Sequence, residues 1–531
     1  MLTERVLLVC IGALGDLAWR KFIAPARNLE SSEPNIELLL VDLPWNETFG
    51  LTLEKELYWR IGRRQIELLA EQINEGKISN LTLNVDLSTS ILPWDADYFF
   101  EEAYVLGPPK LKQQIKEKLK RDIDDWLKYF AGTSVLTRLP RYTTGFAPVA
   151  NRIQRLKESG WKVAVHVATP PQAYPEIIKQ WQLVSDRIVL EKPACGLDPR
   201  GLCYPGAEAL LQQASAVPAS CQLVTNDHYN AKSLVRLLKR FAEFGIFRDI
   251  LSPPRVQRVV LQLLEPSPLP LGRCSFYVGA GGVFGDMAPH IFQTIRALFG
   301  SAVRLPQIEF NGHFRWGRYT DTSTPAAQVV PAAAPYVYDP HYYRGFDTIT
   351  ETFVAFQAQV RVDGHAIPFF CRAGKGLQHE VKSLRVDAAY NDDGAELSFL
   401  FNLSDNNITI VNEQTGFVLA TGNLTIKDPF ESGIPSMSWE YRGVYETLVS
   451  SRWEPDALDS RYFPSLVDGI EMSDRIFDQL FKERSNPSRV LNIYSPKKPS
   501  TQSEILSYLD NAARWDLVVW MKEDEPLSQG P

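Results

Sequence analysis

Polar residues that could carry out acid–base chemistry gather in four short segments of an otherwise apolar sequence. The first is the tripeptide Glu191-Lys192-Pro193, which follows a predicted buried strand. A lysine in that position could donate a hydrogen bond to a substrate hydroxyl or hold an anion. The alternative is a salt-bridged surface lysine, which is the usual environment of this residue type. Lys192 is therefore a candidate substrate contact.

The second segment is NDHYNAK, at 226–232. A predicted strand brings Asp227, His228 and Tyr229 to its end, and Lys232 falls on the first turn of the helix that follows. Histidine, tyrosine and lysine donors beside a helix N-terminus suit a phosphate group. The segment therefore predicts an anion-binding site.

The third segment is GAGGVFGDMAPH, at 279–290, where a glycine-rich loop leads into a helix. Asp286 and His290 are four residues apart, so both side chains lie on one face of that helix. The fourth is IPFFCRAGKG, at 367–376, where a predicted strand ends in a flexible turn bearing Arg372 and Lys375. Taken singly, each segment also has an ordinary structural interpretation, because histidines and basic turns are common at sheet ends.

A glycine turn near the N-terminus supplies the element that could hold a cofactor. The sequence VLLVCIGALGDLAWRK, at 6–21, reads as a buried strand, a tight turn and a helix start. Glycines let the backbone approach a pyrophosphate, and the helix N-terminus offers N–H groups to it. The pattern GxxGxxA lacks one glycine of the full fingerprint, so an ordinary strand–turn–helix is the alternative. The predicted cofactor-binding residues of this turn are Gly12, Leu14, Gly15, Asp16 and Leu17.

Two further strand ends are predicted to contact the same cofactor. Asp42 ends the apolar strand at 36–41 and could accept hydrogen bonds from ribose hydroxyls, although a surface aspartate is the alternative. It would repel a 2′-phosphate, and no arginine follows directly, which favours NAD over NADP. Thr169 and Pro170 end the strand at 161–169, where they could touch the nicotinamide. His166, inside that strand, is interpreted as a packed core histidine.

Composition bounds the class of protein. With 531 residues, the chain is too long for one core, so two or more domains are expected. The net charge of −7 argues against a nucleic-acid surface and for a small-molecule substrate. Six scattered cysteines without a CxxC pair indicate reduced thiols, with neither a disulfide framework nor a zinc site. No apolar run is long enough to cross a membrane, and the first strand leaves no room for a targeting peptide, so a cytoplasmic location is expected.

The succession of patterns predicts an N-terminal Rossmann domain, a doubly wound α/β sheet, over 1–200. A second α+β domain, with a large, mostly antiparallel sheet and helices on one face, is predicted over 201–500. The remainder, 501–531, is predicted to form a C-terminal helix and a polar tail. Strand-like runs lie at 255–264, 350–362, 366–372, 395–402 and 407–412. Charged amphipathic helices are predicted at 16–30, 51–76 and 96–130, and a long loop at 320–347.

Taken together and in this order, these motifs resemble the glucose-6-phosphate dehydrogenase family. That family carries GASGDLA, EKPFG, DHYLGK and VPFYLRSGKRL. This chain reads GALGDLA at 12–18, EKPACG at 191–196, DHYNAK at 227–232 and IPFFCRAGKGL at 367–377. The resemblance extends from about residue 12 to 377, and little of it is left after about 450.

The resemblance implies a role for each matching residue. His290 would be the base that removes the hydroxyl proton as hydride leaves to the nicotinamide, and Asp227 would orient it. Lys192 would contact the sugar near the reacting carbon. The residues that would bind the rest of a sugar phosphate are His228, Tyr229, Lys232, Lys375 and, for the sugar hydroxyls, Glu265.

Departures from the family pattern leave a second assignment open. The family has RDVMQNH before its base histidine, whereas this chain has GDMAPH, with four steps instead of five from aspartate to histidine. That spacing is similar to the Gfo/Idh/MocA sugar dehydrogenases, in which Lys192, Asp286 and His290 would be the catalytic group. Asp42 and Leu43 replace the family's arginine, which weakens NADP use. The segment 96–130 matches neither family.

Two functions follow. The first is an NAD(P)-dependent dehydrogenase that oxidises a hydroxyl of a sugar phosphate similar to glucose 6-phosphate, at C1 or at another ring carbon. The resemblance to the Gfo/Idh/MocA group leaves open an oxidoreductase of that type that acts on another sugar or polyol. The second is a catalytically silent relative that acts as a sensor or assembly partner, which the altered loop before His290 and the unmatched helices at 51–130 motivate. The expected partners are a small-molecule substrate and further copies of the chain, because the open sheet face mediates dimer contacts in the families resembled. No nucleic-acid or membrane partner is expected.

Overall fold

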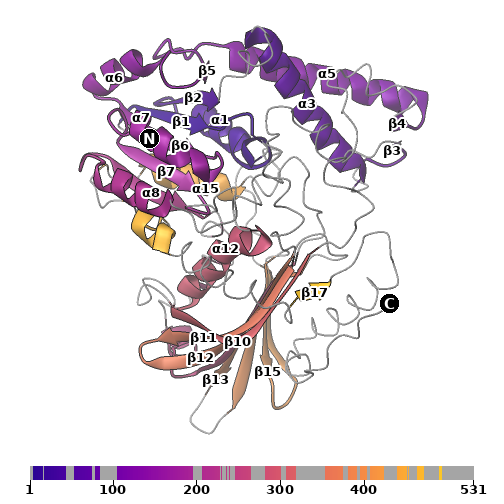
Figure 1. The fold of residues 1–531 in the computed structure, drawn as a ribbon. Helices are drawn as coiled ribbons and strands as arrows, with labels where there is room; N and C mark the ends of the chain where they lie inside the picture. The colour runs from indigo at the N-terminus through magenta and orange to yellow at the C-terminus, as the bar shows by residue number, and fades with distance from the viewer. Residues whose placement is uncertain are drawn as a thin grey trace.

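The computed structural model describes most of the two predicted domains (Figure 1). The described residues are 4–15, 17–42, 53–74, 78–83, 105–194, 206–227, 245–264, 282–299, 307–318, 353–374, 381–390, 395–403, 407–423, 439–450, 463–471 and 490–492, with single positions such as Tyr229 between them.

The N-terminal sheet has six described strands, all parallel. They are β1 (Val6–Ile11), β2 (Ile36–Asp42), β5 (Tyr142–Thr144), β6 (Lys162–Val167), β7 (Arg187–Glu191) and β8 (Gln222–Asn226). Their order is β5-β2-β1-β6-β7-β8, so the chain reverses direction across the sheet between β1 and β6. This is the order of a dinucleotide-binding sheet, whose ligand crevice lies at the carboxyl ends of the strands beside that switch point.

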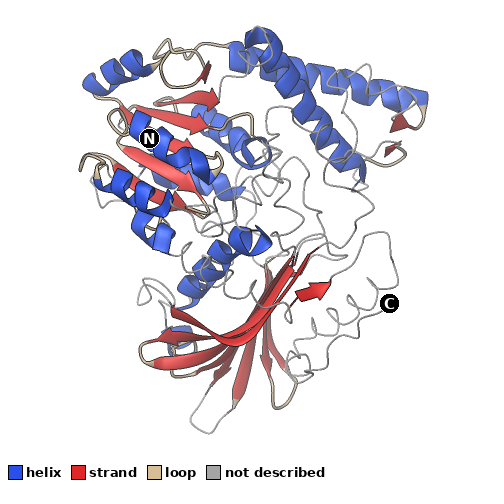
Figure 2. Ribbon diagram, viewed as in Figure 1, coloured by secondary structure: helices blue, strands red, loops and turns tan. Residues whose placement is uncertain are grey.

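Helices cover both faces of this sheet because alternate strand residues point to opposite sides (Figure 2). The described helices of the first domain are η1 (Ala18–Phe22, a π-helix), α1 (Ile23–Ser32), α3 (Leu53–Asn74), α5 (Pro109–Ala131), α6 (Ala150–Glu158), η2 (Pro171–Ala173, a 3₁₀-helix), α7 (Tyr174–Trp181), α8 (Gly206–Ser215) and α15 (Trp439–Ser450), and the other described helices are α10 (Gly245–Ile250) and α12 (Gly282–Phe299). Leu7 and Val9 of β1 pack in one hydrophobic cluster with α6, α7 and α8, while Leu8 and Cys10 pack in another with α1, α3, α5 and α15.

The second sheet has nine described strands in the order β16-β15-β14-β13-β9-β12-β11-β10-β17. They are β9 (Val256–Leu264), β10 (Gln307–Arg318), β11 (Phe353–Val362), β12 (His365–Gly374), β13 (Val381–Ala389), β14 (Glu396–Asn402), β15 (Asn407–Asn412), β16 (Val418–Asn423) and β17 (Val490–Asn492). All neighbours are antiparallel except β12 with β9 and β10 with β17. A separate two-stranded ribbon joins β3 (Thr82–Leu83) to β4 (Val105–Leu106). The predicted fold class, a Rossmann domain followed by a large, mostly antiparallel sheet, is confirmed.

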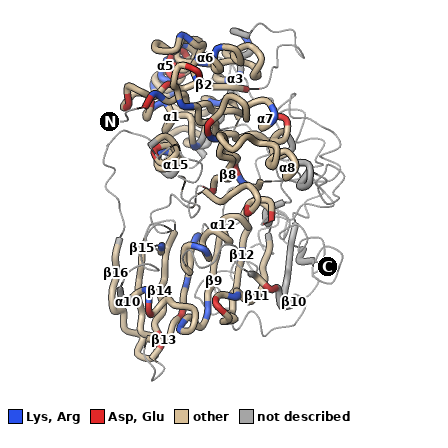
Figure 3. Tube along the Cα trace, turned by 90° about the vertical axis from the view of Figure 1, so that its left-hand side faces the viewer, with Lys and Arg blue, Asp and Glu red and all other residues tan. Residues whose placement is uncertain are grey.

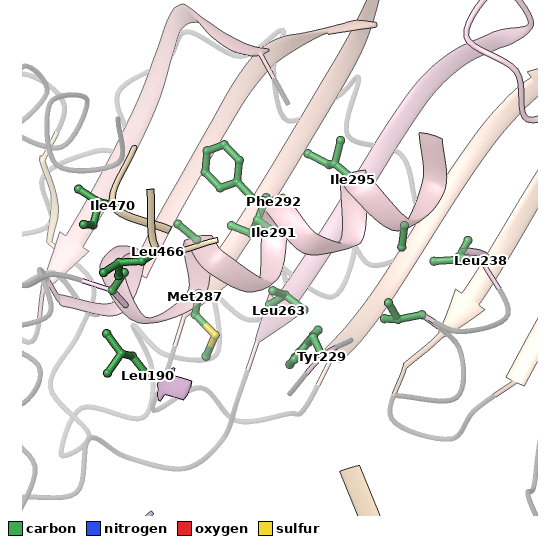
Figure 4. Close-up of a cluster of buried hydrophobic side chains, with 14 of the residues drawn as sticks. Leu190, Tyr229, Leu238, Leu263, Met287, Ile291, Phe292, Ile295, Leu466 and Ile470 are labelled. Carbon is green, nitrogen blue, oxygen red and sulfur yellow. The ribbon is translucent and has the colours of Figure 1, made fainter. Parts of the chain in front are cut away.

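Helix α12 lies between the two sheets and joins their cores (Figures 1 and 4). Met287 and Ile291 of α12 belong to the same buried cluster as Leu190 at the end of β7 and Leu263 of β9. One continuous hydrophobic core therefore fixes α12, with its polar residues, against the carboxyl ends of the first sheet.

Several local expectations need correction. The helix expected at 16–30 starts as the π-helix η1 and continues as α1 to Ser32. Within the segment 96–130, the described helix is α5, which begins only at Pro109, because β4 precedes it. The loop at 320–347 and the helix and tail after 501 lie outside the described residues.

The first sheet also extends past the boundary expected at residue 200. Strand β8, at 222–226, pairs with β7, so the chain finishes this sheet before it enters the second. Helix α15 lies between β16 and β17 of the large sheet in sequence but packs on α1 and η1 of the first domain. The buried tyrosines Tyr441 and Tyr445 explain that return, because they fill the core beneath β1.

None of the helices within the described ranges is long and apolar enough to cross a membrane. Helix α5 carries both basic and acidic residues, including the ion pair of Lys118 with Asp122, whereas the charged residues of α6 are mostly basic (Figure 3). The cytoplasmic location and the homo-oligomer stay predictions.

Candidate active site

Lys192 joins the first sheet to α12. It follows directly after β7, and its Nζ donates to Oδ1 of Asp286 at 2.5 Å and to the main-chain oxygen of the same residue at 2.9 Å. The two side chains are only 12% and 9% exposed, so the pair is not an ordinary surface salt bridge. The lysine of one domain and the helix of the other therefore meet at the carboxyl edge of the Rossmann sheet.

Asp227 and His290 form a second contact across the same junction. Asp227 follows directly after β8, and its Oδ1 lies 2.7 Å from Nδ1 of His290, at the middle of α12. The same oxygen accepts the backbone N–H of Tyr229 at 2.9 Å. A carboxylate facing Nδ1 favours the tautomer with the proton on Nδ1, which leaves the lone pair on Nε2. The arrangement suits a histidine that accepts a proton.

Burial sets the protonation of this pair. Burial lowers the pKa of His290 to about 4; Asp227 acts to raise it, and the charge of Lys192 lowers it further. Burial alone would raise the pKa of Asp227, but the His290 ring and the Tyr229 N–H outweigh that effect, so its pKa lies below the ordinary value. Near neutral pH, a neutral imidazole therefore faces an ionised carboxylate, as a general base requires.

Tyr229 lies against the face of this imidazole. The ring centroids of Tyr229 and His290 are 3.9 Å apart, and the ring planes differ by 15°. The tyrosine is only 3% exposed and sits beside α12 (Figure 4). The resemblance had assigned Tyr229 to a sugar phosphate, whereas the contact made here is with the candidate base.

The glycine turn follows β1 and sits at the switch point. Gly12 has a φ of +83°, and a Cβ built there would lie 2.7 Å from the main-chain oxygen of Ala168. The N–H of Gly15 donates to the oxygen of Gly12, which closes the turn. Leu14 is buried, and its backbone N–H donates to Oδ2 of Asp42 at 2.8 Å. The turn is thus held tightly to the ends of β2 and β6, with no room for a side chain at Gly12.

Asp42 has a second neighbour that the sequence did not reveal. Arg60 of α3 places a guanidinium nitrogen 3.5 Å from Oδ1 of Asp42, and the two side chains are 7% and 13% exposed. The expected preference for NAD rested partly on the lack of an arginine directly after β2. Since the fold brings an arginine there from α3, the next described helix along the chain, that argument loses its force.

The end of β6 lies beside the glycine turn. The Cγ2 of Thr169 is 3.2 Å from the position that a Cβ on Gly12 would take. Its hydroxyl oxygen is buried and has no hydrogen-bond partner among the described residues. Pro170, next to it, is exposed. A buried polar atom without a partner at a ligand crevice fits a bound group that supplies the missing hydrogen bond.

Some predicted site residues cannot be compared with the structure. Those outside the described residues are Asp16, His228, Lys232, Glu265 and Lys375. Leu17 is described and packs against the core beneath the turn. Arg372 is not in a flexible turn as expected, because β12 continues to Gly374 and buries this side chain to 1% exposure.

A buried polar network beneath the site was missed. Oε1 of Glu191 lies 2.9 Å from Nε2 of His166 and accepts hydrogen bonds from Asn226 at 2.7 Å and from the Tyr441 hydroxyl at 3.1 Å. Nδ1 of His166 is 2.8 Å from the Tyr445 hydroxyl. The buried position of His166 was expected, but its tyrosine partners were not, because both lie on α15, far from His166 in sequence.

Comparison with known proteins supplies structural neighbours only. No family model matches the sequence, and no curated protein is similar to it. Glucose-6-phosphate 1-dehydrogenase from Mycobacterium avium matches with a TM-score of 0.52 at 16% identity, covering 92% of this chain and 94% of that one. A glucose-6-phosphate dehydrogenase in complex with glucose-6-phosphate matches with a TM-score of 0.52 at 15% identity, covering 96% and 99%.

An inositol dehydrogenase homologue from Azotobacter vinelandii, complexed with NADH and myo-inositol, matches with a TM-score of 0.48 at 12% identity, covering 90% and 96%. At these identities the likeness concerns the fold alone. The chain is similar, over nearly its whole length, to the two-domain fold of the two glucose-6-phosphate dehydrogenase structures.

Proposed function

We propose that this protein is an NAD(P)-dependent dehydrogenase that oxidises a hydroxyl of a sugar phosphate or a related polyol. One observation carries the proposal. Lys192 at the end of β7 and His290 on α12 come from different domains, yet Asp286 and Asp227 bind them into one junction at the carboxyl edge of the Rossmann sheet. That edge also bears the glycine turn.

The residues at this edge fit a nicotinamide dinucleotide. The crowded turn at Gly12 suits a pyrophosphate, and Asp42 and Arg60 are placed for the adenosine ribose. The hydroxyl oxygen of Thr169, beside Gly12, is buried without a partner among the described residues and could bond to the cofactor. When bound, the cofactor supplies the hydride acceptor. NAD and NADP are both retained, since Asp42 favours one and Arg60 the other.

The chain's own residues supply the acid–base chemistry. Nε2 of His290 accepts the proton of the substrate hydroxyl, and Asp227 stabilises the imidazolium that forms. Lys192 donates a hydrogen bond to the oxygen at the reacting carbon. Because the pair is buried, the positive charge that develops on His290 is offset by a nearby carboxylate rather than by water.

The phosphate part of the proposal comes from sequence motifs alone, since His228, Lys232 and Lys375 lie outside the described residues. The Lys192–Asp286 contact favours a second candidate, a dehydrogenase of the Lys, Asp and His type that acts on an unphosphorylated sugar or polyol. In that case Asp286 holds the lysine, and His290 is still the base.

Ligand-induced stabilisation tests cofactor binding directly. Unfolding temperature would be measured with NAD⁺ and NADP⁺, each alone and with glucose 6-phosphate, glucose or myo-inositol. A ligand at about 100 times its dissociation constant stabilises the native state by about 2.7 kcal/mol, so a clear rise is expected with at least one nucleotide. A chain that responds to neither nucleotide would be the silent relative and not a dehydrogenase.

A further inference from the structure

The contact between Tyr229 and His290 has the geometry of a stacked pair. The ring planes are nearly parallel, at 15°, and the centroids are 3.9 Å apart, closer than most aromatic pairs. His290 is 3% exposed and Tyr229 also 3%, so the stack is buried. An imidazole in this position has one face covered by the tyrosine ring.

The backbone of Tyr229 is fixed by the same carboxylate that fixes the histidine. Oδ1 of Asp227 accepts both the N–H of Tyr229 and the Nδ1–H of His290. Asp227 therefore holds the edge of the imidazole and also places the tyrosine ring against its face. A rotation of His290 away from Asp227 would have to break the stack as well.

We propose that Tyr229 is a positioning residue whose ring, and not its hydroxyl group, serves the site by holding the imidazole of His290 against Asp227 and keeping water from its face. The sequence motif suggested instead that the tyrosine binds a phosphate. The stacked geometry makes the flat ring the functional part. The benefit to catalysis rests on the proposed role of His290 as base, but the effect of the ring on the imidazole does not.

Other groups act on the same imidazole and must be included in a test. Among the described residues, the charged groups that act on His290 are Asp227 after β8, Lys192 after β7, and Asp286 on α12 itself. Burial outweighs the attraction of Asp227, so that the pKa of His290 falls to about 4. If the ring no longer excludes water, the attraction of Asp227 remains and the pKa should rise toward its ordinary value.

The test is a histidine titration followed by NMR on the full chain, with histidine labelled at its Cε1 carbon. The chain has seven histidines, and the His290→Gln variant identifies the signal of His290. Tyr229→Phe keeps the ring and removes the hydroxyl, whereas Tyr229→Ala removes the ring. Tyr129→Leu is the control, because it removes a tyrosine ring from α5, where it bonds to Glu30 and not to the site.

In the wild type, in Tyr229→Phe and in Tyr129→Leu, the His290 signal is expected to show an uncharged imidazole throughout the pH range in which an ordinary histidine titrates. In Tyr229→Ala the midpoint is expected to rise by about one pH unit or more, a tenfold gain in proton affinity. If Tyr229→Ala does not fold, Tyr229→Leu, which keeps apolar bulk without a flat ring, should move the midpoint in the same direction by a smaller amount.

Two results would overturn the proposal. One is a ring-free variant that folds and titrates like the wild type, which would mean that the ring has no effect on the base. The other is a Tyr229→Phe variant that titrates like Tyr229→Ala, which would assign the effect to the hydroxyl. The titration needs neither nucleotide nor sugar, so its outcome is independent of whether the protein proves to be a dehydrogenase.

Discussion

At the scale of single residues, the candidate base is described by what surrounds it. His290 is buried among Asp227, Tyr229 and the Lys192–Asp286 pair, and its neutral form is favoured. The sequence could indicate Lys192 and Asp227 because both directly follow apolar strands, whose carboxyl ends must meet at one edge of a parallel sheet. It could not indicate that Tyr229 turns toward His290, because no pattern encodes a side-chain direction after a strand has ended.

The lowered pKa of His290 predicts how stability depends on pH. In the unfolded chain this histidine binds a proton below about pH 6.5, whereas in the folded protein it does so only below about 4. Between these values the unfolded state holds more protons, so the free energy of unfolding must rise with pH across that window. Across that window, the free energy of unfolding should rise by about 3 kcal/mol because of His290. The lowered pKa of Asp227 also costs stability in acid, but only at lower pH, below the ordinary aspartate pKa of 3.8.

Urea unfolding between pH 4 and 6.5 checks this. His290→Gln should lose less stability than the wild type as the pH falls. The matched control is His365→Gln, since His365 is exposed at the start of β12 and should leave the slope unchanged. Equal slopes for the wild type and His290→Gln would show that the imidazole is not held neutral in the fold.

At the scale of elements, one carboxylate ties the strand ends together. Glu191 precedes Lys192, and Asn226, which donates to Glu191, precedes Asp227. His166 of β6 and Tyr441 of α15 reach the same oxygen. Lys192 and Asp227 of the site therefore each follow directly after a residue of a buried network, which fixes β6, β7 and β8 relative to each other.

Removing the Tyr445 hydroxyl should loosen this network. Tyr445→Phe leaves Nδ1 of His166, which is fully buried, without its hydroxyl partner. An unsatisfied buried polar group costs about 1–3 kcal/mol, so the free energy of unfolding in urea should fall by that amount. Tyr129→Phe is the control. The Tyr129 hydroxyl donates to Glu30, which keeps its ion pair with Arg141 when that hydroxyl is lost, so the free energy of unfolding should fall by about 1 kcal/mol or less. A Tyr445→Phe variant no less stable than Tyr129→Phe would contradict the network.

The glycine turn allows a matched pair of variants. Gly12 and Gly160 both have positive φ, +83° and +88°, but only at Gly12 would a Cβ meet neighbouring atoms, with Ala168 at 2.7 Å. Gly160→Ala should lose about 1 kcal/mol from backbone strain alone. Gly12→Ala must in addition move the turn, and its affinity for NAD⁺ or NADP⁺, measured by calorimetry, should fall about tenfold or more. Undiminished affinity in Gly12→Ala would remove the turn from the cofactor site.

At the scale of the whole molecule, the long apolar strands made the fold class predictable. Their order was not, because β8 closes the first sheet after the expected boundary and α15 returns to the first domain between two strands of the second sheet, β16 and β17. Arg60 reaches Asp42 from α3, a helix inserted between β2 and β5. Each of these contacts depends on how helices and strands pack on the finished sheet, and a local sequence pattern does not contain that information.

The central claim is that two domains assemble one site for hydride transfer, with His290 as its base. The most direct measurement is the absorbance of reduced nicotinamide, followed with NAD⁺ and NADP⁺ over a panel of sugar phosphates and unphosphorylated sugars. The account predicts reduction with at least one substrate, and a turnover about 10²-fold lower in His290→Gln while the nucleotide still binds. If His290→Gln reduced the nucleotide as fast as the wild type, or if the wild type reduced neither nucleotide with any sugar in the panel, the claim would be contradicted.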